Sequence, residues 1–125
     1  MRFQRFAKRY IVRLESGRHL AASITALLAH EEVAFASLTA AGAVRSVRLG
    51  YWDATSCRYE YRDVAEQLEV VSFEGSAALK DGEPFLHLHG AFSRRDFSVG
   101  GHIKDAVVHP TMEVWLRGGL DAPDS

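Results

Sequence analysis

Alternating apolar and polar positions near the N-terminus predict that the chain enters a β-sheet before any helix forms. The stretch RYIVRLE places Tyr10, Val12 and Leu14 on one face and mostly polar residues on the other. Because strand side chains point alternately to the two faces of a sheet, this pattern is typical of a strand with one buried face. We therefore expect this stretch to form the first strand.

The following stretch, SGRHLAASITALLAHEE, changes from strand spacing to helical spacing. Its apolar residues recur at the intervals expected for one face of an α-helix, namely at Leu20, Ile24, Leu27 and Leu28. Ser16 belongs to a residue type that favours helix N-termini, and we expect it to be the N-cap. We predict one main helix here and no second one elsewhere.

Strand patterns dominate the rest of the chain. The expected strands are VAFASLTA, VRSVRLGYW, CRYEYRDV, QLEVVSFEGSAAL, PFLHLHGAF, GHIKDAVV and MEVWLRG. In CRYEYRDV, the residues Cys57, Tyr59 and Tyr61 alternate with charged ones and predict a half-buried strand. Asp81-Gly82 is a strong signal for a tight hairpin, whereas SRRDFSVG is long for one. This order predicts an α+β fold, a mostly antiparallel β-sheet with one main helix packed on it.

Length and composition indicate one ordinary globular domain. The chain has 125 residues, of which 47% are hydrophobic and 25% are charged, and this suits one modest core. We expect a single domain over residues 1–125, with its core at about 9–118 and a frayed tail at 119–125.

Charge and cysteine content narrow the choice of compartment and partners. The net charge of −1 offers no general attraction for DNA phosphates. A local basic face on neighbouring strands is an alternative, formed by Arg45, Arg48, Arg58 and Arg62. The single cysteine, Cys57, excludes an intramolecular disulfide and fits a reducing compartment, where we expect a packed thiol. No signal peptide or bilayer-length apolar run is visible, so we expect a cytoplasmic protein without a membrane partner.

Three of the six histidines fall within the segment FLHLHGAFSRRDFSVGGHIKD. His87 and His89 alternate with leucines typical of a core, so the two histidines should face away from it. A strand that returns antiparallel after the glycine pair would bring His102 beside them. Three neutral imidazoles without a thiolate favour zinc, or a borderline metal such as nickel, cobalt or iron. We predict a metal site at His87, His89 and His102; the alternative is a group of surface or interface histidines.

An acid or base beside such a metal would support catalysis. Three protein ligands leave a fourth coordination position open, as catalytic zinc sites do, and an open zinc can activate water or polarise a carbonyl. Glu113, at the start of the last expected strand, is our candidate catalytic residue, and Glu74 and Glu83 are second choices. For His19 and His30, at the two ends of the helix, we expect structural or solvated roles.

Four segments of the chain together resemble a known family. They are LESG before the helix, LTAAGAVRSVRLGYWD, EVVSFEGSAALKDGEPFLHLHGAFS and VGGHIKDAVVHPTMEVWL. From about Tyr10 to Arg117 the sequence resembles the PPC domain, the plant and prokaryote conserved domain, in its prokaryotic single-domain form. HLH, GGHI and MEVWL are the strongest motifs. The chain departs from the usual pattern after Gly17, where many members have acidic residues and this one has Arg18-His19.

The resemblance implies a compact α+β domain that forms homotrimers and holds a metal, zinc in the first instance, at His87, His89 and His102. The implied architecture is similar to that of acetolactate decarboxylase, a zinc enzyme that also uses a His-x-His pair and a downstream histidine. Plant members follow an Arg-Gly-Arg-Pro element that binds the DNA minor groove, and this chain has no such element.

Three functional hypotheses follow. The first is a homotrimeric zinc-binding protein of this family that binds a small molecule or a protein partner in a regulatory role. The second is a metal-dependent lyase or hydrolase, which the open coordination position favours. The third is a DNA-associated regulator, as the plant relatives imply.

Overall fold

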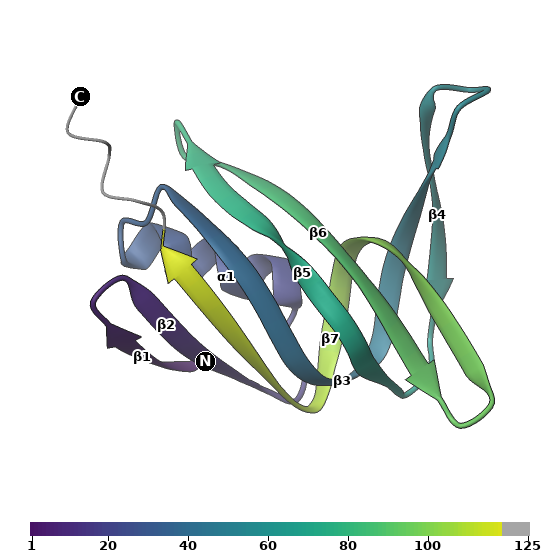
Figure 1. Ribbon diagram of the computed structural model, residues 1–125, viewed down its shortest axis with the longest axis horizontal. Helices are drawn as coiled ribbons and strands as arrows, with labels where there is room; N and C mark the ends of the chain where they lie inside the picture. Colours follow the sequence, from purple (N-terminus) through teal and green to yellow (C-terminus); the bar gives the residue numbers. More distant parts are fainter. Residues whose placement is uncertain (119–125) are drawn as a thin grey trace.

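The computed structural model describes residues 1–118, and the tail expected at 119–125 lies outside the described residues. Over this range the chain forms seven β-strands and one α-helix (Figure 1). In chain order they are β1 Arg2–Phe6, β2 Arg9–Glu15, α1 Leu20–His30, β3 Phe35–Asp53, β4 Arg58–Val64, β5 Leu68–Lys80, β6 Glu83–Arg94 and β7 Phe97–Gly118. Every strand pairing is antiparallel, which confirms the predicted α+β class.

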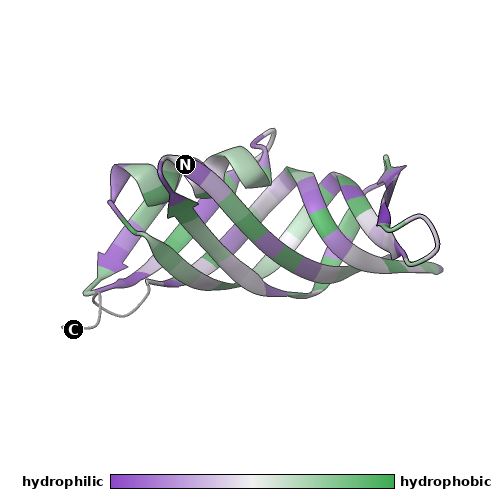
Figure 2. Ribbon diagram, turned by 90° about the horizontal axis from the view of Figure 1, so that it is seen from above, coloured by the Kyte–Doolittle hydropathy of each residue, from purple (hydrophilic) through white to green (hydrophobic). Residues whose placement is uncertain are grey.

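Two long strands, β3 and β7, organise the sheet. They pair with each other along most of their length, while β5 pairs with β3 and β6 pairs with β7. Because β5 and β6 also pair, the four strands β3, β5, β6 and β7 form a closed cycle of hydrogen-bonded neighbours. The strands therefore cross one another steeply when the molecule is seen from above (Figure 2). Within this cycle the β6–β7 hairpin brings the two ends of the histidine segment into one region.

The helix covers one face of the sheet, as its apolar spacing predicts. Leu20, Ile24, Leu27 and Leu28 are all buried. They join the inward-facing residues of β2 and β7, which include Val12, Leu14, Val114 and Leu116. Each fully buried leucine stabilises the fold by about 1.5–3 kcal/mol relative to an exposed one. The opposite face of these strands is not covered by the helix and carries polar side chains together with Ile11 and Trp115.

The start of the helix differs from the sequence prediction. The helix begins after His19, and Ser16 is not its N-cap. Instead, the Ala21 N–H donates to Asp105 Oδ1 at 2.9 Å, and Asp105 Oδ2 lies 2.8 Å from His19 Nδ1. Asp105 belongs to β7, so a residue distant in sequence satisfies a backbone donor that a local cap normally serves.

Several strand boundaries also differ from the expected ones. VAFASLTA and VRSVRLGYW join into the single strand β3, and GHIKDAVV and MEVWLRG join into β7. At Gly42 the chain adopts φ +137°, and a Cβ there would lie 2.5 Å from the Thr111 carbonyl oxygen. The glycine therefore permits β3 to bend against β7 without ending the strand. The sequence analysis did not predict β1, in which only Phe3 is partly buried and the other residues are exposed.

β4 is exposed on both faces from Arg58 to Asp63, which corrects the prediction of a half-buried strand. Tyr59 and Tyr61 are exposed, and so is Cys57, which lies in the turn before β4 at φ 56°. The Cys57 thiol is therefore exposed and not packed, contrary to the prediction. Figure 1 shows that the β3–β4 hairpin projects from the body of the sheet, where no second layer covers it.

Candidate metal centre

His87 and His89 point away from the core because the residues between and beside them are core residues. On β6 the exposure alternates, so that Leu88 is only 1% exposed while both histidines are exposed. Leu88 and Phe92 anchor the inner face of the strand in the main cluster. Strand geometry then directs the two imidazoles to the outer face, as predicted.

His102 reaches the same face through a tight hairpin. The turn between β6 and β7 contains only Arg95 and Asp96, and the rest of SRRDFSVG extends the two strands. The expectation of a long connection was therefore wrong, although the antiparallel return is confirmed. In the resulting register His102 lies directly opposite His89. A Cβ at Gly100 would lie 2.9 Å from the Gly90 carbonyl oxygen, so glycine permits this close approach of the strands.

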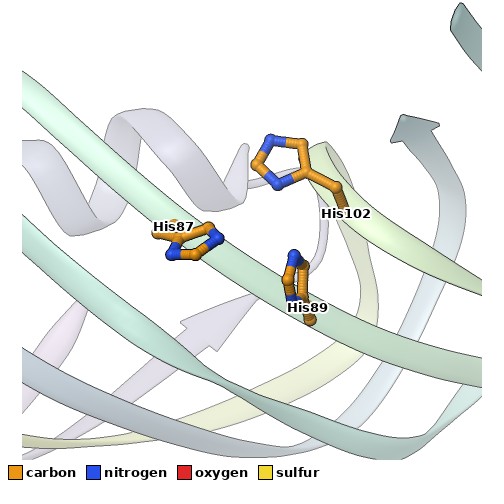
Figure 3. A group of neighbouring side chains, drawn as sticks. All are labelled: His87, His89 and His102. Carbon is orange, nitrogen blue, oxygen red and sulfur yellow. The ribbon is translucent and has the colours of Figure 1, made fainter. Parts of the chain in front are cut away.

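The three imidazoles converge in a geometry close to that of a metal site. One ring nitrogen of each histidine lies within 4.8 Å of the others. The ring centroids are 4.8 Å apart for His87 and His89, 5.7 Å for His89 and His102, and 6.1 Å for His87 and His102. Figure 3 shows each ring turning a nitrogen toward the space between them. Tetrahedral zinc ligands lie about 3.3–3.4 Å apart, so small side-chain rotations would complete the fit.

The electrostatics of His102 favour the neutral form that a metal requires. Burial lowers the pKa of His102, and the nearby His89, His87 and Lys104 lower it further. Its Nδ1 is buried and has no hydrogen-bond partner in the described part of the chain. A buried polar atom without a partner is costly, and coordination to a metal would remove this cost. The donor set and the unpartnered nitrogen both fit zinc or a similar divalent transition metal.

An aromatic side chain that the sequence analysis did not associate with the histidines covers one of them. The Tyr59 ring lies against the His102 ring, with 5.0 Å between centroids and 32° between planes. A Cβ at Gly50 would lie 3.1 Å from the Tyr61 ring and 3.4 Å from the His102 ring, so glycine leaves room for all three rings. Only the pairing of β4 with β3 and of β3 with β7 brings Tyr59 to this place.

The candidate acidic residues lie at different distances from the histidines. Glu74 on β5 lies directly opposite His89 and lines the same groove as His87 and His89. Glu113 faces outward on β7 but lies opposite Ala41 of β3, well beyond the part of β7 that pairs with β6. It is not among the groove residues. Within one chain the structure therefore brings Glu74 closer to the histidines than Glu113.

The second-choice acid Glu83 and the remaining histidines lie outside the cluster. Glu83 begins β6 opposite Lys80. His19 Nδ1 contacts Asp105, and His30 Nδ1 lies 2.9 Å from Glu31 Oε2. His109 Nδ1 lies 2.7 Å from the Ser16 hydroxyl oxygen. These local contacts agree with structural or solvated roles for the histidines.

The fold and the histidine cluster define a small antiparallel domain with a site capable of holding a metal, and comparison with known proteins assigns the family. The model of the Plants and Prokaryotes Conserved (PCC) domain matches residues 1–118. The chain therefore belongs to the PCC domain family, the same family as the PPC domain that the sequence resembles. A comparison with curated proteins finds no match.

Solved structures of similar proteins support the same assignment. A metal-containing protein from Archaeoglobus fulgidus is 31% identical, with a TM-score of 0.83 over 94% of this chain and 84% of that chain. A candidate DNA-binding protein from Bacteroides thetaiotaomicron is 19% identical, with a TM-score of 0.89 over 96% of this chain and 85% of that chain. The second likeness concerns the fold alone.

The predicted likeness to acetolactate decarboxylase is also found. The α-acetolactate decarboxylase from Bacillus subtilis has a TM-score of 0.60 and 13% identity over 88% of this chain and 52% of that chain. The present chain thus spans about half of the decarboxylase, and the likeness is one of fold.

No helix among residues 1–118 is long and apolar enough to cross a membrane.

Proposed function

We propose that this protein binds a divalent transition metal, zinc in the first instance, through His87, His89 and His102. The observation that carries the proposal is the convergence of three ring nitrogens within 4.8 Å of one another. Three imidazoles leave one coordination position of a tetrahedral ion for an external ligand. We propose that a small molecule or an exposed group of a protein partner occupies this position and that the protein acts in regulation, in the cytoplasm. The Archaeoglobus protein described as metal-containing supports the metal part of this proposal.

Metal content measured on the purified protein tests this proposal. We expect about one zinc per chain in the native protein after zinc loading and dialysis, and near-background zinc in His87→Ala and His89→Ala. His30→Ala is a matched control because His30 is exposed at the end of α1, away from the cluster. Equal, near-background zinc in all four proteins would refute the proposal.

We further propose that the protein is a homotrimer. The β3–β4 hairpin exposes several aromatic rings, with Trp52 58% exposed and Tyr61 44% exposed. Monomeric soluble proteins rarely leave such a group of apolar side chains uncovered. Light scattering coupled to size exclusion should therefore give three times the chain mass of 13.9 kDa. A Trp52→Ser, Tyr61→Ser variant should give a smaller mass, and a native mass of one chain would refute the assembly.

A metal-dependent lyase or hydrolase is the second candidate function. The position of Glu74 favours it, because this carboxylate lies opposite His89 in a groove of about 990 Å³. A carboxylate beside a metal-bound ligand can act as a general acid or base. Glu113, the residue predicted from the sequence, stays the alternative for this role. Substitution of each glutamate by glutamine distinguishes the two candidates.

Association with DNA has less support. Similar folds include proteins described as candidate DNA-binding proteins, from Bacteroides thetaiotaomicron among others. The net charge of −1 supplies little attraction for phosphates in a single chain. Binding to duplex DNA that weakens steeply with salt would support this function, and absence of binding at low salt would exclude it.

A further inference from the structure

The outer face of the sheet carries a groove whose two ends differ in charge and chemistry. Strand register arranges its outward side chains in two rows that run across the sheet. The first row is Arg9, Arg117, Ser37, Ser76 and His87, and the second is Ile11, Trp115, Thr39, Glu74 and His89. Both rows line the groove of about 990 Å³. Each row therefore leads from β2 and β7 to the histidines on β6.

The middle of the groove is hollow because its outward side chains there are small. Ser37 and Ser76 separate Arg117 from His87 along the first row. Three strand spacings of 4.7–4.9 Å place the backbones of Arg117 and His87 about 14 Å apart, less where the sheet curves. The hydroxyl groups can accept or donate hydrogen bonds, so the floor suits a ligand with a partly polar chain.

The end of the groove at β2 and β7 is positively charged. Arg9 and Arg117 are paired residues in the register, so both guanidinium groups project from adjacent positions on the outer face. Among residues 1–118, neither arginine has a carboxylate within ion-pair distance, whereas Arg18 and Arg94 do. Two adjacent guanidinium groups without acidic partners in this part of the chain match the two oxygens of a carboxylate.

The groove also has an apolar wall and a negatively charged group near its other end. Trp115 and Ile11 are adjacent to the arginines and are each 39% exposed. Glu74 lies opposite His89 and, in the metal-free protein, would repel a ligand carboxylate from the histidine end. In the metal-free protein the charges therefore favour one orientation of a bound anion, with its carboxylate at Arg9 and Arg117.

We propose that this groove binds a small organic carboxylate, with the carboxylate on Arg9 and Arg117 and a metal-binding oxygen at the other end of the molecule. This inference rests on the proposed function only at the histidine end, where the oxygen meets the metal. The arginine end contributes separately to the affinity for the ligand, and this contribution can be measured with or without a metal. The ligand class is thus a carboxylate that carries a hydroxyl, carbonyl or similar oxygen several bonds away.

Two hydroxamates of equal length test the inference in the zinc-loaded protein. Suberic monohydroxamic acid ends in a carboxylate and octanohydroxamic acid ends in a methyl group, while both offer a hydroxamate to zinc. Trp115 reports binding by fluorescence in a Trp52→Phe background, because the chain has two tryptophans. We expect the carboxylate compound to bind about tenfold or more tightly than the methyl compound, as a charge-assisted hydrogen bond allows.

Substitution of the arginines should remove this preference and leave zinc in place. In Arg9→Gln, Arg117→Gln protein we expect equal affinity for both hydroxamates and unchanged zinc content. Arg13→Gln is the matched control, because Arg13 lies on the same face of β2 but outside the groove; it should keep the preference. Equal binding of the two compounds to the native protein, or an undiminished preference in the double variant, would overturn the inference without affecting the zinc proposal.

A second measurement separates the inference from the metal. In chelator-treated protein, titration with suberate should shift the Nε–H nuclear magnetic resonance signals of Arg9 and Arg117 but not that of Arg13. This result is expected even if the protein proves to bind no zinc. Absence of selective shifts at Arg9 and Arg117 would overturn the arginine site, whatever the zinc content.

Discussion

His102 lies directly opposite His89 across the β6–β7 hairpin, and the turn that joins their strands contains only two residues. This pairing places a third imidazole beside the His-x-His pair with little freedom to move away. It also buries part of the His102 ring among other positively ionisable groups, which lowers its pKa. Because His102 pairs directly with His89, the protonation of the site should depend on pH. Its geometry should depend on the backbone positions of β6 and β7.

The first prediction concerns stability and pH in the metal-free protein. His102 titrates below its ordinary pKa of 6.5 in the folded state, so the unfolded state binds more protons in this range. The free energy of unfolding should therefore decrease as the pH falls from above 6.5 through the lower folded pKa, and then level off.

Urea unfolding in the presence of a chelator, between pH 8 and pH 5, would measure this dependence. In His102→Gln the His102 contribution should disappear, so the slope of stability against pH should be smaller than in the native protein. An equal or steeper slope in the variant would show that His102 is not the group responsible.

The second prediction concerns the start of α1. Asp105→Ala removes the acceptor of the Ala21 N–H and should lower the free energy of unfolding by about 0.5–2 kcal/mol, the usual cost of losing a cap. Ser16→Ala should change it by less than about 0.5 kcal/mol, because Ser16 is exposed and does not cap the helix. Chemical denaturation of the two variants checks this order, and a larger loss for Ser16→Ala would contradict it.

The third prediction concerns the close packing of β5 against β6. A Cβ at Gly75 would lie 2.1 Å from the His87 carbonyl oxygen, so the backbone must move to accommodate alanine. Gly75→Ala should cost about 1–3 kcal/mol or more in stability and should weaken zinc binding, because the displaced strand carries His87.

Glu69→Ala on the same strand is a suitable control for this substitution, because Glu69 is exposed and lies opposite Ser93, away from the histidines. It should leave both quantities nearly unchanged. Wild-type stability together with wild-type zinc affinity in Gly75→Ala would show that β5 and β6 are not packed as described.

The fourth prediction ranks the two acidic candidates. If the zinc-loaded protein hydrolyses a generic ester such as p-nitrophenyl acetate, Glu74→Gln should reduce the rate about 10²-fold or more, as loss of a general acid or base does. Glu113→Gln should have little effect, because Glu113 lies on the part of β7 that pairs with β2 and β3 and not on the part that pairs with β6. Zinc content must be equal in both variants. A larger loss in Glu113→Gln would support the sequence-based choice and require Glu113 to reach the metal from another chain.

The parts of the site that the sequence predicted correctly are those that depend on local alternation. The burial of Leu88 between His87 and His89 follows from a two-residue period, which needs no knowledge of neighbouring strands. The Asp81-Gly82 hairpin is equally local, since both residues adopt positive φ, at 54° and 80°. The apolar face of α1 is a third case of this kind.

Other features depend on which strands pair and in what register. Ser16 is a good N-cap by residue type. Asp105 of β7 nevertheless accepts the hydrogen bond from the Ala21 N–H, because tertiary packing brings it to the start of the helix. Likewise, no local signal places Tyr59 against His102 or Glu74 opposite His89. A shift of one residue in any of these pairings would send the side chains to the other face.

By itself, then, the sequence determined the class of fold, the one helix and the outward direction of His87 and His89, because each follows from a repeat of apolar residues along a short stretch. Only the tertiary structure decided that Arg9 and Arg117 share a groove with His87 and His89, and that Tyr59 lies against His102. The physical reason is that the closed cycle of β3, β5, β6 and β7 sets long-range register through the whole core, and no single segment contains that information.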